Sequence, residues 1–291
     1  MAGGLSSSTF RDCKKWPEYK LSQPKEAGMQ ERHLDRKIYF NEQFITTTKY
    51  VIPYLEEYFS AGKHRRVMEI GCGEGGNLLP FLDAGCDVTG IDLSAGKIDK
   101  ARIYFSEHPN RGNLKLICDD VYQLDDTAGR FDLIFLRDVI EHIYDQGKFL
   151  HFVLRFLKPG GVIFFAFPPW QNPFGGHQQI CRNRLLSHMP WVHLLPRSIY
   201  TAILQFGGET QATINALLEI RDTRLTIERF ETLLQQQRYR ILRKSYYLIN
   251  PNYEVKFGLK PRLVPAFLGK IPWLRNFVTT TAYYLIDLPT T

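Results

Sequence analysis

The sequence predicts an α/β fold whose mostly parallel sheet carries helices on both faces. Short apolar segments alternate with helical ones from residue 65 to Pro168, and this alternation is typical of parallel strands joined by helical crossovers. The first apolar segment, Val67-Met68-Glu69-Ile70, runs directly into a glycine-rich turn. With 291 residues, 44% of them hydrophobic, the chain is long enough for one large core with additions.

The expected elements follow one another as strand, helix and strand. Five parallel strands are expected at 67–70, 86–92, 114–118, 131–137 and 162–167, and helices at 80–84, 95–108 and 144–157. A capped helix is expected at 226–237, followed by two strands at 241–249 and 253–257. These two strands should pair antiparallel through the turn Asn250-Pro251-Asn252 and complete the sheet.

The segments outside this alternation are interpreted as additions to the core at 61–170. Residues 1–60 are expected to form a mobile arm and a helical cap, because apolar residues recur at helical spacing between 29 and 59. Tyr39 or Gln43 of this cap could touch the cofactor or the substrate. Residues 171–225 are expected to form a lid or a small helical subdomain, 226–258 the completion of the sheet, and 259–291 an amphipathic C-terminal extension.

The glycine turn indicates a site for a nucleotide-like cofactor. Gly71, Gly73 and Gly76 satisfy G-x-G-x-x-G, a motif that holds a ligand at a helix N-terminus. Glu69 precedes the turn, where a carboxylate would repel the phosphates of a dinucleotide but would suit a cationic ligand. Asp92 ends the second strand and can accept from both ribose hydroxyls, although an acid at this position can equally cap a helix.

These motifs resemble those of class I S-adenosylmethionine-dependent methyltransferases that act on small molecules. The matching pieces are MEIGCGEGG, DVTGIDLS, CDDVYQL, FDLIFLRDVIEHI and LKPGGVIFFAFP, in the family's order, over about residues 65–170. The resemblance implies a Rossmann-like, seven-stranded sheet and S-adenosylmethionine as the cofactor.

The resemblance also assigns residues to the parts of this cofactor. It implies Glu69, Gly71, Cys72 and Gly73 around the methionine part, Asp92 and Leu93 at the ribose and adenine, Asp119 or Asp120 with Val121 at the adenine, and Arg137 and Asp138 beside the transferred methyl group. The family usually has a glycine where Asp119 stands, so the sequence leaves open which of the two adjacent acids faces the adenine.

Two histidines are candidates for a general base. Methyl transfer is an in-line displacement, in which an enzyme mainly aligns the nucleophile and excludes water, but a hydroxyl acceptor also benefits from a base. His177 follows two glycines just beyond the fifth strand, where ligands collect in open α/β sheets. His142 stands in the Glu-His pair after the fourth strand. Either histidine could instead have a purely structural role.

Composition limits the classes of partner. The net charge of +7 is spread over the chain and is not gathered in one basic segment, which makes a nucleic-acid partner unlikely. The five cysteines lack metal-site spacing, so we expect no bound metal and a reduced, cytoplasmic protein. The predicted activity is O-methylation of a small hydrophobic or glycosylated metabolite, with an RNA methyltransferase or a non-catalytic S-adenosylmethionine-binding protein as alternatives.

The C-terminal extension has two interpretations. Its apolar and basic residues could contact a membrane surface peripherally, or they could pack on the core, which is the commoner fate of such a segment. The sequence does not indicate the oligomeric state.

Overall fold

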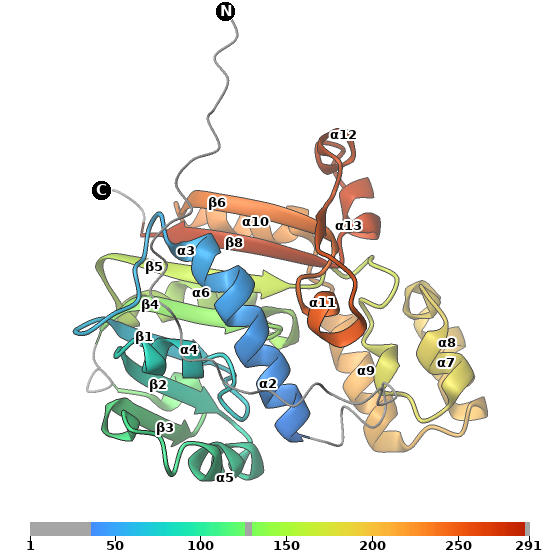
Figure 1. The fold of residues 1–291 in the computed structure, drawn as a ribbon. Coiled ribbons are helices and arrows are strands. Elements are labelled where there is room, and N and C mark those ends of the chain that lie inside the picture. Colours follow the sequence, from blue (N-terminus) through green and yellow to red (C-terminus); the bar gives the residue numbers. More distant parts are fainter. Residues whose placement is uncertain (1–35, 126–129, 289–291) are drawn as a thin grey trace, which may run out of the picture.

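An eight-stranded sheet forms the centre of the computed structural model, which describes residues 36–125 and 130–288 (Figure 1). The strands are β1 (Arg66–Ile70), β2 (Asp87–Asp92), β3 (Leu114–Cys118), β4 (Phe131–Arg137), β5 (Leu157–Phe167), β6 (Arg240–Ile249), β7 (Arg262–Leu263) and β8 (Thr281–Asp287). Their order is β3-β2-β1-β4-β5-β8-β6-β7. The first five strands pair in parallel, and β8 is antiparallel to both β5 and β6. The expected α/β fold with a mostly parallel sheet is therefore confirmed.

The expected end of the sheet is wrong in two respects. Residues expected as a strand at 253–257 form helix α11 (Asn252–Phe257), because the Asn250 and Pro251 carbonyls accept from the Tyr253 and Glu254 amides and start a helical turn. The strand that pairs with β5 and β6 is instead β8, within the segment interpreted as an extension. The sheet consequently has eight strands, not seven.

Helices cover both faces of the sheet. One face packs against η1 (Thr47–Val51), α3 (Ile52–Leu55), α4 (Leu79–Asp83) and α5 (Ala95–Tyr104), and the other packs against α6 (Gln146–Val153) and α10 (Ile227–Gln236). Each face buries its own apolar cluster, with Phe135 and Phe164 on the first and Ile134 and Phe165 on the second. This alternation of neighbouring residues between two clusters is what strands buried on both faces require.

Two groups of helices lie beside the sheet. Helix α2 (Arg36–Thr46) runs across one face and continues into η1 (Figure 1). The segment after β5 contains α7 (Arg184–His188), α8 (Arg197–Phe206) and α9 (Gln211–Thr223), with a small apolar cluster of its own around Tyr200. The expected arm at 1–28 and the beginning of the expected cap lie outside the described residues. Among the helices that the structure describes, none has the length and apolar character needed to cross a bilayer.

The segment between β6 and β8 contains α11, β7, α12 (Ala266–Gly269) and α13 (Leu274–Val278), drawn in orange and red in Figure 1, where α12 and α13 project from the body of the molecule. Helix α11 contacts α2 and its continuation, where the Lys49 ammonium lies 2.9 Å from the Glu254 carboxylate. The projection therefore begins beside the helix that crosses the sheet.

Candidate functional site

A cavity of about 680 Å³ lies where β1, β4 and β5 end. Its lining includes Gly71 and Gly73 after β1, Arg137 and Asp138 at the end of β4, and Pro168 after β5. Helix α2, the segment after β5 and helix α11 supply the other walls. Since β1 and β4 are neighbours although the chain runs from β1 outward to β3 before it returns, the cavity is at the topological switch point of the sheet, where open α/β sheets bind ligands.

The glycine turn after β1 adopts backbone conformations that exclude larger residues. Gly71 has φ 73°, and a Cβ atom added to it would lie 2.4 Å from a methyl carbon of Val139. Gly73 has φ 57°, and no other group lies within 4 Å of where its Cβ would be. Its backbone is therefore open to close approach by a ligand. Cys72, between them, is buried with its sulfur against β2 at Gly90 and does not line the cavity.

Glu69 is a buried acid with an unused oxygen. Its Oε1 accepts from the Asn77 amide at 2.7 Å, whereas Oε2 has no hydrogen-bond partner among the described residues. Burial raises the Glu69 pKa to about 8, against the opposing effects of Asn77 and the positive charge of Arg137. An unpaired buried carboxyl beside a glycine turn fits the ammonium group of a methionine-like ligand, which would restore its charge.

Asp92 and Leu93 lie at the end of β2. The two Asp92 oxygens accept from the backbone amides of Gly73 and Ser94, each at 2.9 Å, so this carboxylate ties the glycine turn to the start of α5. Each oxygen keeps a second lone pair that a ribose hydroxyl could use. The Leu93 side chain is 74% exposed, which leaves its apolar surface available to a flat ring.

The structure separates the roles of the two adjacent acids after β3. Asp120 caps the short helix η3 (Val121–Gln123), with Oδ1 accepting from the Tyr122 amide at 3.0 Å. Asp119 is exposed, and its Oδ1 accepts from the amide of Asp120. Val121 is buried. These three residues, like Glu69, Asp92 and Leu93, are not in the lining of the cavity described above.

Arg137 is the last residue of β4, Asp138 follows it, and both line the cavity. The Arg137 guanidinium is buried and donates to the Asn77 side-chain oxygen at 3.2 Å. Asp138 is exposed to the cavity, lies 3.8 Å from Arg137 and has a left-handed backbone with φ 55°. Asn77 thus bridges Glu69 and Arg137, and it is a residue that the sequence analysis did not identify.

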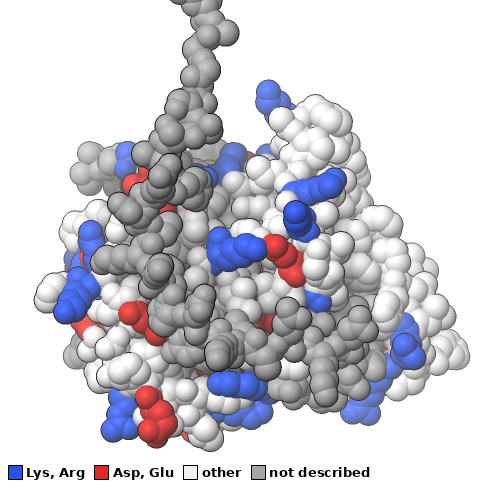
Figure 2. Space-filling model, viewed as in Figure 1, with Lys and Arg blue, Asp and Glu red and all other residues white. Residues whose placement is uncertain are grey.

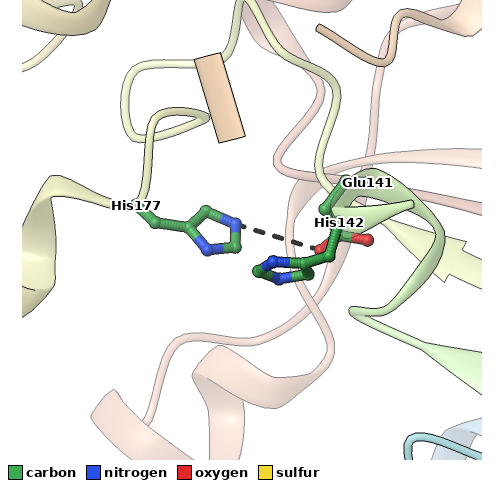
Figure 3. A group of neighbouring side chains, drawn as sticks. All are labelled: Glu141, His142 and His177. Atoms are coloured by element: carbon green, nitrogen blue, oxygen red, sulfur yellow. Dashed lines mark ion pairs between the residues drawn. The ribbon is translucent and has the colours of Figure 1, made fainter. Parts of the chain in front are cut away.

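His142 and His177 both line the cavity, and their side chains lie next to each other (Figure 3). Their ring centres are 5.1 Å apart, and Nε2 of His177 lies 3.9 Å from the carboxylate of Glu141. Removal from bulk water lowers the pKa of each histidine to about 4, aided by His177 in the case of His142 and by His193 in the case of His177. Both imidazoles are therefore neutral at pH 7.

Glu141 is the main side chain of this group that the sequence analysis missed. It is buried, and neither of its oxygens has a hydrogen-bond partner among the described residues. Burial, together with the nearby charge of Asp138, raises its pKa well above the usual range. The signal in the sequence was the Glu-His pair, in which the sequence analysis weighed only the histidine.

The same three residues could also hold a cation. One ligand atom from each of Glu141, His142 and His177 lies within 4.8 Å of the others. Two neutral imidazoles and one carboxylate form a donor set that divalent metals accept. The geometry is thus compatible with either a proton-transfer group or a metal site.

Helices α2 and α11 contribute further residues to the cavity. Tyr39 and Gln43 of α2 line the cavity, where the sequence analysis considered them. Arg36 and Glu74 form a two-pronged ion pair with distances of 2.6 and 2.8 Å at its edge. Tyr253, expected in a strand, lines the cavity from α11.

Comparison with known proteins gives a family. Residues 42–206 match the family model described as "Methyltransferase domain". The ubiquinone biosynthesis O-methyltransferase of Coxiella burnetii (strain Dugway 5J108-111) is 32% identical over 116 residues, which are 40% of this chain and 48% of that protein. The protein of the same name from Nitrobacter winogradskyi is 37% identical over 100 residues, 34% of this chain and 36% of that protein. The matches thus span about half, or less, of these relatives' length.

Solved structures share the fold at low sequence identity. The plantazolicin methyltransferase BpumL, in complex with a triazolic desmethylPZN analog and SAH, superposes with a TM-score of 0.51 at 16% identity, covering 89% of this chain and 94% of that one. The magnesium protoporphyrin IX methyltransferase of Synechocystis PCC 6803, with bound SAH, has a TM-score of 0.50 at 16% identity, covering 88% and 87%. These likenesses concern the fold alone.

Proposed function

The chain belongs to the methyltransferase-domain family, which confirms the resemblance found in its motifs, and we propose that it transfers a methyl group from S-adenosylmethionine to an oxygen of a small hydrophobic or glycosylated metabolite. One observation carries this proposal. The glycine turn and two neutral histidines line the same cavity. A volume of about 680 Å³ is within the range of small-molecule sites.

The residues present fit the cofactor. Glu69, with its unpaired buried oxygen, would receive the ammonium of the methionine part, and the open backbone at Gly73 would allow close approach. Asp92 would accept from the ribose hydroxyls, and Leu93 would cover the adenine together with the segment Asp119-Asp120-Val121. When bound, S-adenosylmethionine supplies a methyl group that its sulfonium already activates.

His177 is the proposed general base. A neutral imidazole can take the proton of an acceptor hydroxyl as the oxygen attacks the methyl carbon. Nε2 of His177 faces Glu141, which leaves Nδ1 for the acceptor. The Nε2–H of the imidazolium that forms would point toward the Glu141 carboxyl, whose oxygens have no hydrogen-bond partner among the described residues and can accept from it. His142, in contact with the His177 ring, would line the acceptor side, and Arg137 with Asp138 would flank the methyl group.

Turnover of labelled methyl donor with separated cell fractions tests the proposal. We expect label in the small-molecule or lipid fraction, and we expect His177→Ala to lower turnover by roughly 10²–10⁴-fold while leaving the affinity for S-adenosylhomocysteine nearly unchanged. His151→Ala, an exposed histidine on α6, is the matched control. Unaltered turnover in His177→Ala would give that residue a structural role.

The two alternative functions appear as separate outcomes of the same assay. Label in the RNA fraction would indicate an RNA methyltransferase, although in the face shown in Figure 2 basic side chains are scattered among acidic and uncharged ones. Binding of S-adenosylhomocysteine without transfer to any fraction would indicate a non-catalytic binding protein.

A further inference from the structure

The projection between α11 and β8 presents an unusual number of large apolar side chains to solvent. Seven of the nineteen large hydrophobic residues that are exposed in the described parts of the chain lie between 257 and 274. We call them the C-terminal apolar surface: Phe257, Leu259, Leu263, Phe267, Ile271, Trp273 and Leu274. Phe267 and Trp273 are 68% and 62% exposed. Exposed apolar residues gathered in this way mark an interaction site more often than a packing defect.

The charges of the same segment all have one sign. No acidic residue occurs between Glu254 and Asp287, whereas five lysines and arginines do. Arg275 is paired with Glu228 and Glu231. Lys260, Arg262 and Lys270 are exposed and form no ion pair with a described residue. In Figure 2, the projection that Figure 1 labels α12 is white with blue side chains at its edge.

The surface is continuous with the mouth of the cavity. Phe257 and Leu259 belong to the C-terminal apolar surface and also line the cavity, as does the neighbouring Lys256. A molecule that leaves the apolar surface can therefore enter the cavity without crossing the body of the protein. Aromatic and aliphatic side chains bordered by lysine and arginine are the combination that binds at the interface of an anionic bilayer.

We propose that the C-terminal apolar surface docks on an anionic lipid bilayer and sets the mouth of the cavity against it, so that the acceptor is a lipid-soluble molecule taken from the bilayer. Docking on the bilayer is inferred from the exposed apolar surface and its positive charge alone. Only the second part of the proposal, that the acceptor comes from the bilayer, rests on the proposed function. The two parts are therefore separable by experiment.

Co-sedimentation of the full chain with vesicles tests the docking. We expect binding to vesicles of phosphatidylcholine and phosphatidylserine at low salt, weaker binding at high salt, and little binding to phosphatidylcholine alone. Lys260→Gln, Arg262→Gln and Lys270→Gln together should lower the partition coefficient on the order of 100-fold, at roughly five-fold for each cation. The matched control removes three exposed charges near β3, by Lys100→Gln, Arg102→Gln and Lys115→Gln.

The apolar part of the surface has its own variant and control. Leu263→Ser with Phe267→Ser should abolish co-sedimentation, whereas Ile103→Ser, on α5 and as exposed as Phe267, should not. Every variant should keep its affinity for S-adenosylhomocysteine, which shows that it is folded.

Absence of vesicle binding by the intact protein at low salt, or equal losses of binding in the control variants, would overturn the proposal. If the intact protein does not bind vesicles and a variant of the C-terminal apolar surface changes its oligomeric state, the proposal is overturned, and the surface instead binds a second copy of the chain. Vesicle binding without methyl transfer would refute the proposed function and leave the docking intact.

Discussion

Glu69 gives the sharpest test of how the site holds its cofactor. Burial raises its pKa to about 8, so at pH 7 about nine-tenths of the molecules carry a protonated Glu69 before ligand binds. If the ammonium of S-adenosylhomocysteine then lies beside it, the carboxyl must ionise, and binding should release about 0.9 protons at pH 7 and about half a proton at pH 8. Calorimetry in buffers with different ionisation enthalpies measures this number directly.

The variant Glu69→Gln separates this carboxyl from other sources of protons. On binding S-adenosylhomocysteine, Glu69→Gln should release almost no protons, and its affinity should not change between pH 6 and pH 8. The affinity of the wild type should rise with pH up to about 8. Losing the charged contact should weaken binding by about 1.5–3 kcal/mol. At pH 7, however, the wild type must spend about 1.4 kcal/mol to ionise Glu69 on binding, a cost that glutamine does not have. The affinity deficit should therefore be small at pH 7 and larger at pH 8.

The same shift predicts the stability of the free protein. The folded pKa of Glu69 lies above its unfolded value, so its contribution is fully present below about pH 4.5 and is lost as the pH rises toward 8. Free Glu69→Gln should therefore be more stable than the wild type at pH 7, by up to about 3 kcal/mol in urea unfolding. Glu107→Gln, at an exposed position, is the control. Equal proton release by wild type and Glu69→Gln would refute the reasoning.

Four further results are expected. Asp92→Ala should weaken S-adenosylhomocysteine binding by on the order of 1.5–3 kcal/mol in calorimetry, and an unchanged affinity would remove this acid from the cofactor site. At saturating S-adenosylmethionine, turnover should stay level between pH 6 and pH 8 and fall with a midpoint near pH 4, because burial lowers the His177 pKa to about 4; a midpoint near 6.5 would mean that the base is exposed. Chelation with EDTA should leave turnover unchanged, whereas a loss that a divalent cation restores would make Glu141, His142 and His177 metal ligands. Burial likewise lowers the His193 pKa to about 4, so the free energy of unfolding should fall by up to about 3 kcal/mol as the pH falls from about 6.5 toward 4. In urea unfolding, His193→Gln should show a smaller decrease over that range.

The cofactor half of the fold was predictable because its signals are local. Each of β1 to β4 is a short apolar run that ends in an acid or is followed by a glycine or an acid, and β1 and β2 lie within one residue of their expected positions. The segment at 253–257 was not predictable in this way. Tyr253, Val255 and Phe257 alternate as in a strand, but five residues are too few to separate a strand from a helical turn, and the turn that begins at Asn250 and Pro251 makes the segment helical.

The candidate site shows the same division. Gly71, Gly73, Arg137 and Asp138 follow strand ends, so their positions in the cavity follow from the order of the strands. The approach of His177 to His142 depends on how the chain folds back after β5, which no short pattern encodes. Asn77 was missed because an isolated amide has no distinctive spacing, and its bonds to Glu69 and Arg137 become visible only in the structure. Glu141 stands in the Glu-His pair, but the pair alone does not show that its carboxyl is buried without a hydrogen-bond partner among the described residues.

The position of β8 has a consequence for how the chain folds during synthesis. β6 leaves the ribosome before β8, but β6 does not pair with β5 directly. The two strands become part of one sheet only when β8 inserts between them. Until then the nascent chain has an unpaired edge at β5. Helix α11, which lines the cavity, follows a strand that is not yet paired with the rest of the sheet. Because strands that are distant in sequence pair slowly and leave edges open to other chains, the half of the sheet formed by β5, β8 and β6 should be the last part to mature and the part most dependent on chaperones.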